Sequence, residues 1–135
     1  MKIKNLHHIC IQTNKYEESI RFYTEMIGFK VIKETPGFHG RDYNTWLELN
    51  GTMIELQTPK GEKPLSPWSS LNEGPVHLSF LVEDIEEAYE EIRGKGHTDF
   101  KVKNGEVIYK VENGCLFKIK APEGTEIEIR DNNKI

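Results

Sequence analysis

The stretch GTEIEI at residues 124–129 decides the fold, because it repeats the stretch GTMIEL at residues 51–56. In both copies a glutamate, Glu55 or Glu128, stands between two large apolar side chains in a segment that alternates as a strand does. The two glutamates are 73 residues apart (128 − 55 = 73). A repeat at this spacing predicts two copies of one structural unit.

The first copy reads as a strand, a helix and three strands. Residues 6–13 alternate around β-branched side chains, and Asn14 is the expected N-cap of a helix that ends at Gly28. Three further strands are expected at residues 29–33, 44–49 and 52–58, the last two joined by a hairpin turn at Asn50-Gly51.

The second copy repeats this order after a proline-rich connection. Residues 59–75 hold four of the six prolines, and Asp84 is the expected N-cap of the second helix. Strand segments are expected at residues 76–82, 100–102, 106–111, 115–120 and 125–130. We therefore expect a single α+β domain over residues 1–135, with module one at 1–58, a linker at 59–75 and module two at 76–130.

Polar side chains fall at matching places in the two modules. A shift of 69 residues lays His8 on His77, and a shift of 73 lays Glu55 on Glu128. Because side chains alternate along a strand, all four belong to the faces opposite the apolar ones. If the two sheets curl toward each other, two imidazoles and two carboxylates point into one concavity.

Such a set predicts a metal site. Carboxylates deep in a cavity are costly unless a positive charge compensates them. A set of two histidines and two carboxylates leaves positions open on an octahedral ion. We expect one divalent ion per site, with Ni²⁺ or Co²⁺ favoured and Zn²⁺, Mn²⁺ or Fe²⁺ possible.

The other histidines and the two cysteines are expected to be structural. His7 is predicted to face away from His8, whereas His39 and His97 lie in turns next to glycine. Cys10 shares the face of His8 and could border the cavity, but Cys10 and Cys115 are interpreted as reduced packing thiols.

Composition excludes several classes of partner. The net charge is −4 and no lysine and arginine cluster is interleaved with aromatic residues, so nucleic acid is not expected as a partner. No apolar run approaches the length of a membrane span, so no membrane partner is expected and a cytoplasmic location is predicted.

The ordered motifs resemble a known family. They are His8-Ile-Cys-Ile, FYTEMIGF at 22–29, Ile54-Glu55-Leu56, His77-Leu-Ser-Phe and PEGTEIEI at 122–129. Together they resemble the vicinal oxygen chelate superfamily, and within it glyoxalase I and methylmalonyl-CoA epimerase. The resemblance implies two paired βαβββ modules that form an incomplete eight-stranded barrel around one metal, usually in a homodimer. It also implies that the metal ligands are His8, Glu55, His77 and Glu128.

The resemblance further implies an activity. A lactoylglutathione lyase-like metalloenzyme converts a thiol adduct of a 2-oxoaldehyde to a 2-hydroxyacyl thioester, by proton transfer through a metal-bound enediolate. Glu128 is the expected base, with Glu55 as its counterpart on the other face of the substrate. The alternatives are a methylmalonyl-CoA epimerase-like isomerase and a metal-free small-molecule-binding protein of the antibiotic-resistance type.

The substrate carrier stays open between glutathione, coenzyme A and other thiols. Bacterial glyoxalase I usually has arginine where this chain has Gln12, and asparagine where it has Pro59. The linker residue Trp68 either anchors the linker or borders the cavity mouth, where it would contact the substrate. A homodimer is expected because sheets of this size expose apolar faces, and the two modules could pair within the chain or across the dimer.

Overall fold

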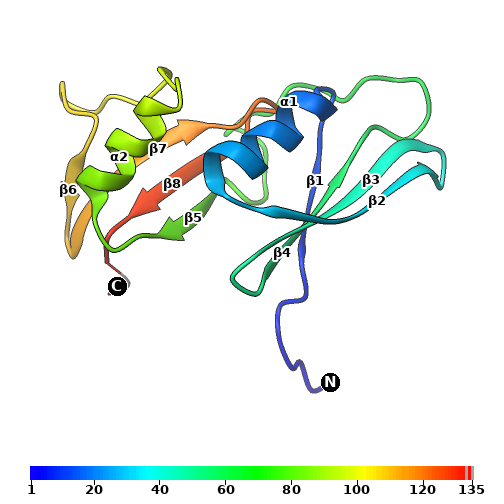
Figure 1. The fold of residues 1–135 in the computed structure, drawn as a ribbon, viewed down its shortest axis with the longest axis horizontal. Coiled ribbons are helices and arrows are strands. Elements are labelled where there is room, and N and C mark those ends of the chain that lie inside the picture. Colours follow the sequence, from blue (N-terminus) through cyan, green and yellow to red (C-terminus); the bar gives the residue numbers. More distant parts are fainter. Residues whose placement is uncertain (133, 135) are drawn as a thin grey trace. The chain divides into compact units, whose positions relative to one another are not determined.

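The computed structural model describes residues 1–132 and 134, and the chain divides into two compact units, Met1–Pro67 and Trp68–Ile135. Each unit holds a four-stranded sheet and one helical segment (Figure 1). Among the described residues, no helix has the length and apolar character needed to cross a bilayer.

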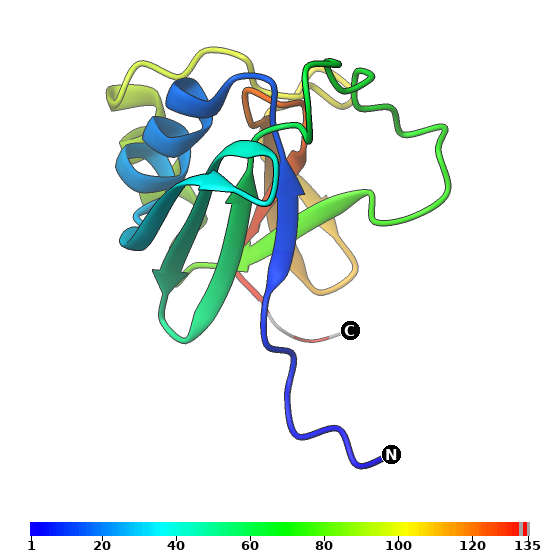
Figure 2. The same ribbon diagram turned by 90° about the vertical axis from the view of Figure 1, so that its right-hand side faces the viewer.

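The first unit has the predicted β-α-β-β-β order. Its elements are β1 (Ile9–Gln12), α1 (Tyr16–Arg21), the π-helical segment η1 (Phe22–Ile27), β2 (Lys30–Phe38), β3 (Arg41–Leu49) and β4 (Thr52–Gln57). The strands are ordered β1-β4-β3-β2, with β1 parallel to β4 and the other neighbours antiparallel. The chain before β1 extends away from this sheet (Figure 2).

The second unit repeats this topology. Its elements are β5 (His77–Leu81), α2 (Ile85–Gly94), β6 (Tyr109–Val111), β7 (Gly114–Lys120) and β8 (Glu126–Arg130). The strands are ordered β5-β8-β7-β6, and β5 is parallel to β8 as β1 is to β4. The prediction of two βαβββ modules is therefore confirmed.

The parallel strand pairs bring like faces together. Ile54 and Leu56 of β4 are 1% and 0% exposed, and Ile127 and Ile129 of β8 are 0% and 4% exposed. The register sets Ile54 beside Ile9 in one sheet and Ile127 beside Leu78 in the other. One face of each pair is thus apolar, which leaves the histidines and glutamates on the opposite face, as alternation predicted.

Two local predictions were wrong. Asn14 does not cap α1, because its side-chain amide is used by Leu65: Nδ2 donates to the Leu65 carbonyl at 3.0 Å, and Oδ1 accepts from the Leu65 N–H at 2.9 Å. Lys15 takes the N-cap position instead.

In the second module, residues 100–102 form no strand but make a single bridge from Phe100 to Ile119. Asp84, in contrast, caps α2 as predicted, by accepting from the Glu87 N–H at 3.0 Å.

The connection between the sheets makes one contact with each unit near its middle, through Leu65 and Trp68. The bonds to Asn14 fix Leu65 within the first unit. Trp68 lies on Gly124 in the second unit, where a Cβ added to the glycine would come within 2.9 Å of the Trp68 Cβ. Gly124 also has a φ of 102°, so both its backbone conformation and its neighbour require glycine.

Candidate functional site

His8 and Glu55 form a pair on the polar face of the first sheet. The Nε2 atom of His8 lies 3.5 Å from Oε2 of Glu55. The His8 side chain is 33% exposed and the Glu55 side chain 14% exposed. Both residues are predicted from the sequence as site residues, and the structure brings the imidazole and the carboxylate together.

His77 and Glu128 form the equivalent pair in the second sheet. The Nε2 atom of His77 lies 3.8 Å from Oε2 of Glu128, and the side chains are 35% and 8% exposed. Among the described residues, no three or more histidine, cysteine, aspartate or glutamate side chains lie close enough together to hold a metal ion. Each unit contains one histidine–glutamate pair.

The two pairs have the same position in the strand register. Glu55 lies opposite Cys10, two residues after His8, and Glu128 lies opposite Ser79, two residues after His77. Each histidine is thus the diagonal neighbour of its glutamate on a parallel strand pair, within reach of a long side chain. A one-residue slip of either register would move the glutamate to the apolar face.

Each glutamate also interacts with the residue opposite it. The Oγ of Ser79 donates to Oε1 of Glu128 at 2.9 Å. The Cys10 thiol lies near the Glu55 carboxylate, and desolvation and the negative charge of Glu55 raise the pKa of this thiol to about 11. At neutral pH Cys10 is thus a thiol rather than a thiolate. Cys10 is exposed, however, so the prediction that it is a packing residue is wrong.

The modules differ at the position beside the glutamate on the next strand. In the first sheet this position is Trp46, opposite Glu55, and its ring meets the His8 ring edge to face at 4.9 Å. In the second sheet the position is Lys118, opposite Glu128, and its Nζ lies 3.4 Å from Oε2 of Glu128. Neither residue was predicted from the sequence.

Lys118 belongs to a charged cluster around the buried Glu126. Its Nζ lies 2.8 Å from Oε1 of Glu126, and Lys101 Nζ lies 2.9 Å from Oε2. Burial alone would raise the pKa of Glu126, but the hydrogen bonds and charges of Lys118 and Lys101 outweigh it and lower this pKa. Burial would likewise lower the pKa of Lys118, yet Glu126 and Glu128 hold it above its usual value.

The structure corrects the prediction for His7. The Nδ1 atoms of His7 and His8 lie 2.8 Å apart, and both rings lie edge to face with Trp46. Strand alternation failed here because β1 begins only at Ile9. If the His8 Nδ1–H donates to His7, the His8 Nε2 atom that faces Glu55 keeps its lone pair for a metal ion.

Gln12 is joined to a cation from another strand. The Nη1 atom of Arg41 donates to Oε1 of Gln12 at 2.9 Å and to the Thr58 carbonyl at 2.6 Å. Gln12 lies on the polar face that carries the Cys10 thiol, and the positive charge of Arg41 acts on that thiol to lower its pKa, against the larger effects that raise it. Arg41 therefore places a positive charge near this end of the site.

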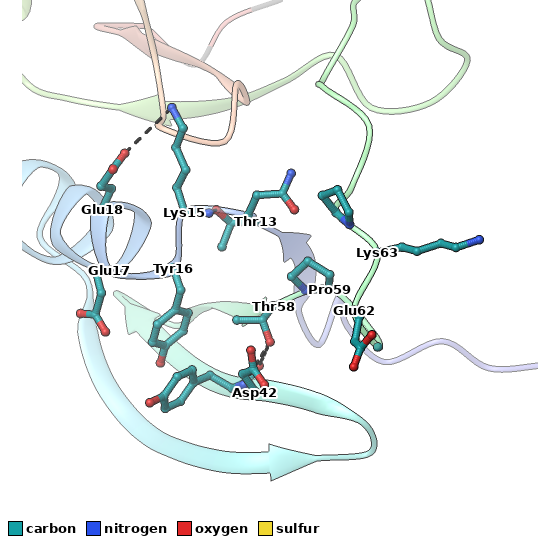
Figure 3. Close-up of a pocket in the computed structure, with 14 residues that line it drawn as sticks. Thr13, Lys15, Tyr16, Glu17, Glu18, Asp42, Thr58, Pro59, Glu62 and Lys63 are labelled. Carbon is teal, nitrogen blue, oxygen red and sulfur yellow. Dashed lines mark hydrogen bonds and ion pairs between the residues drawn. The ribbon is translucent and has the colours of Figure 1, made fainter.

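A cavity of about 630 Å³ lies within the first unit, beside the start of α1 (Figure 3). Neither His8 nor Glu55 lines it. Its charged lining includes Lys15, which pairs with Glu18 at 4.0 Å. The connection that follows β4 contributes Glu62 and Lys63 to the same lining. This cavity is distinct from the His–Glu pair of the same unit.

A family comparison accounts for the architecture. The sequence profile described as "Glyoxalase/Bleomycin resistance protein/Dioxygenase superfamily" matches residues 5–129. Uncharacterized protein YwkD of Bacillus subtilis (strain 168) is 36% identical over 99 residues, which cover 71% of this chain and 75% of that protein.

Solved structures share the fold over nearly the whole chain. A glyoxalase family protein from Enterococcus faecalis has a TM-score of 0.79 at 24% identity, covering 97% of this chain and 100% of that chain. The E126Q mutant of the fosfomycin resistance protein FosX from Listeria monocytogenes, in complex with Mn(II) and 1S,2S-dihydroxypropylphosphonic acid, has a TM-score of 0.71 at 16% identity. That match covers 98% of this chain and 93% of that chain.

Proposed function

Because the chain belongs to the glyoxalase/bleomycin resistance protein/dioxygenase superfamily, we propose that it is a metal-dependent enzyme that moves a proton next to a carbonyl group of a small molecule. The observation that carries this proposal is the presence of a His–Glu pair at the same register position of both modules. The Mn(II) complex of the structural relative FosX gives further support.

The donor set fits a divalent ion. The two pairs provide two imidazole nitrogens and two carboxylates, and in each pair these atoms are less than 4 Å apart. The carboxylates are 14% and 8% exposed, so they need a positive partner. We propose that His8, Glu55, His77 and Glu128 hold one Ni²⁺ or Co²⁺ ion, with Zn²⁺, Mn²⁺ or Fe²⁺ as substitutes. In this proposal the modules pair as an incomplete eight-stranded barrel, within one chain or across a dimer.

The bound ion would act as a Lewis acid for negative charge that develops on substrate oxygen. Glu128 is the base in our proposal, and Ser79 fixes its rotation by donating to Oε1. Glu128 takes the proton from the carbon that carries sulfur and hydroxyl and returns it to the neighbouring carbonyl carbon, while the hydroxyl proton passes to the former carbonyl oxygen. The substrate is thereby isomerised from a thiol adduct of a 2-oxoaldehyde to a 2-hydroxyacyl thioester, without net loss of atoms. Glu55 serves the opposite face of the substrate.

Activity assays on metal-loaded protein test this function. We expect thioester to form from methylglyoxal and a thiol, tested with glutathione and with coenzyme A, only when Ni²⁺ or Co²⁺ is present. If no thioester forms but a 2-methylated CoA thioester exchanges its α-proton with D₂O, the epimerase-like alternative holds. If both assays fail and the protein binds no metal, a metal-free binding protein is the remaining assignment.

We predict that Trp68 affects substrate binding more than stability. Trp68 contacts Gly124, and Gly124 belongs to the turn that leads into β8, the strand of Glu128. Trp68→Ala should raise the apparent KM severalfold and lower the melting temperature only slightly, because its side chain is only partly buried. Leu71→Ala, at a side chain that is 93% exposed in the same connection, is the control and should change neither value. A large fall in melting temperature with unchanged kinetics would make Trp68 only an anchor.

We predict a homodimer. β2 is an edge strand of its sheet. Two consecutive residues of β2, Val31 and Ile32, are 48% and 60% exposed. An unpaired edge with exposed apolar side chains commonly pairs with a second chain. Sedimentation at micromolar concentration should give the mass of two chains, and a monomeric mass would exclude the dimer.

A further inference from the structure

We propose that Lys118 is an internal cation that holds Glu128 in the absence of metal and competes with metal binding. This role rests on the proposed function, because it requires Glu128 to be a metal ligand. The affinity for metal would then depend on Lys118, a residue of β7 that is not itself a ligand.

The contacts of Glu128 carry the first step. Lys118 Nζ lies 3.4 Å from Oε2, the same oxygen that faces His77 Nε2 at 3.8 Å. The next cation, Arg130, is farther away, with its Nη1 3.9 Å from Oε1. Lys118 therefore lies at the oxygen that a metal ion shared with His77 would use.

Burial strengthens the attraction between Lys118 and Glu128. The side chains of Lys118 and Glu128 are only 14% and 8% exposed, so solvent screens their attraction much less than at a surface. A dication that binds Glu128 would be repelled by an ammonium at this position. The metal must therefore either displace Lys118 from Oε2 or tolerate its charge.

Lys118 has a second partner and space to move. Its Nζ already bonds Oε1 of Glu126 at 2.8 Å, closer than it lies to Glu128. A cavity of about 140 Å³ is lined by Lys118 and Glu126 together with Lys101 and Lys120. Lys118 can thus withdraw from Glu128 without losing its stronger ion pair.

The first module shows what the site is like without this cation. Its equivalent position is Trp46, so Glu55 faces an aromatic ring and His8 where Glu128 faces an ammonium. Among the described lysine and arginine side chains, none is recorded in an ion pair with Glu55. The two halves of the proposed centre therefore differ: among the described residues, an ammonium contacts Glu128, whereas Arg41 in the first module is bonded to Gln12 and Thr58.

Metal titration of variants tests this role. We expect Lys118→Met to bind Ni²⁺ about tenfold more tightly than the unmodified protein, because an unscreened positive charge is removed. Lys118→Met should also unfold at a lower temperature when metal-free, because Glu126 and Glu128 lose a partner. Lys118→Arg keeps the charge and should bind Ni²⁺ no more tightly than the unmodified protein.

Lys101→Met is the matched control. Lys101 pairs with Glu126 at 2.9 Å but has no recorded contact with Glu128, and its side chain is 56% exposed. This variant should leave the Ni²⁺ affinity nearly unchanged.

The outcomes separate the two proposals. If the unmodified protein binds Ni²⁺ but Lys118→Met binds it equally or more weakly, the role of Lys118 is wrong and the metal centre stands. Tighter binding by Lys118→Arg would contradict the role in the same way, even if the methionine variant does not fold. If neither the unmodified protein nor any variant binds Ni²⁺, Co²⁺ or Mn²⁺, the metal centre itself is wrong.

Discussion

Glu128→Gln will retain metal but lose turnover by about 10²- to 10⁴-fold, the usual contribution of a positioned base. An amide oxygen can still coordinate a metal ion, but an amide does not accept the substrate proton. The substitution is nearly isosteric, and Ser79 can still donate to the oxygen at the Oε1 position. Metal content by atomic absorption and kcat on the same preparation provide the comparison.

Glu126→Gln is the control for this substitution. Glu126 belongs to the same strand and is equally buried, but its partners are Lys101 and Lys118 rather than a histidine. At saturating Ni²⁺ it should keep most of the turnover, with some loss of stability; its metal affinity is not part of this control, because Glu126 is also the ion-pair partner of Lys118. Near-normal turnover in Glu128→Gln would place the base elsewhere, with Glu55 as the next candidate.

His77→Ala will lose metal and activity together. Loss of a residue that merely supports a ligand already costs about 10- to 100-fold in metal affinity, so loss of the ligand itself should cost at least as much. His8→Ala should have the same effect, because His8 occupies the same register position in the other module. Metal content after dialysis against dilute metal solution measures the effect.

A surface histidine is the control for both histidine variants. His39 is exposed in the turn between β2 and β3 and has a φ of 48°. His39→Asn removes the imidazole and keeps a side chain that tolerates this conformation. It should bind metal normally, whereas full occupancy in His77→Ala would remove His77 from the site.

The two modules and the faces on which Glu55 and Glu128 lie were predicted from the sequence. The repeat of the GTMIEL and GTEIEI stretches gave the two modules, and alternation assigned Glu55 and Glu128 to the polar faces. The first of these predictions needed only a comparison of two segments, and the second only the two-residue period of a strand. The family profile and the strand orders of the two sheets agree with them.

The sequence could not predict the partners across strands. Lys118 lies beside Glu128, and Trp46 beside Glu55, only because of the register of the antiparallel pairs. The spacing of residues along the chain does not determine which residues lie opposite each other on neighbouring strands. The repeat identifies residues that match between the modules, whereas Lys118 and Trp46 occupy one position with different side chains.

Local geometry accounts for the remaining errors. Asn14 was a reasonable N-cap, but its amide bonds to Leu65, 51 residues later in the chain. His7 was assigned to the wrong side because β1 starts two residues after it. In both cases a tertiary contact, or the end of an element, outweighed a local pattern.

The most direct test of the proposed centre is X-ray absorption spectroscopy of the Ni²⁺-loaded protein, with His8→Ala and His77→Ala measured beside it. One ion shared by both modules predicts two imidazole ligands, with the remaining positions filled by oxygen and none by sulfur. Each histidine variant should then lose one imidazole from whatever metal it retains. A site with a single imidazole, or one that keeps both imidazoles in either variant, would contradict a centre built from His8, Glu55, His77 and Glu128.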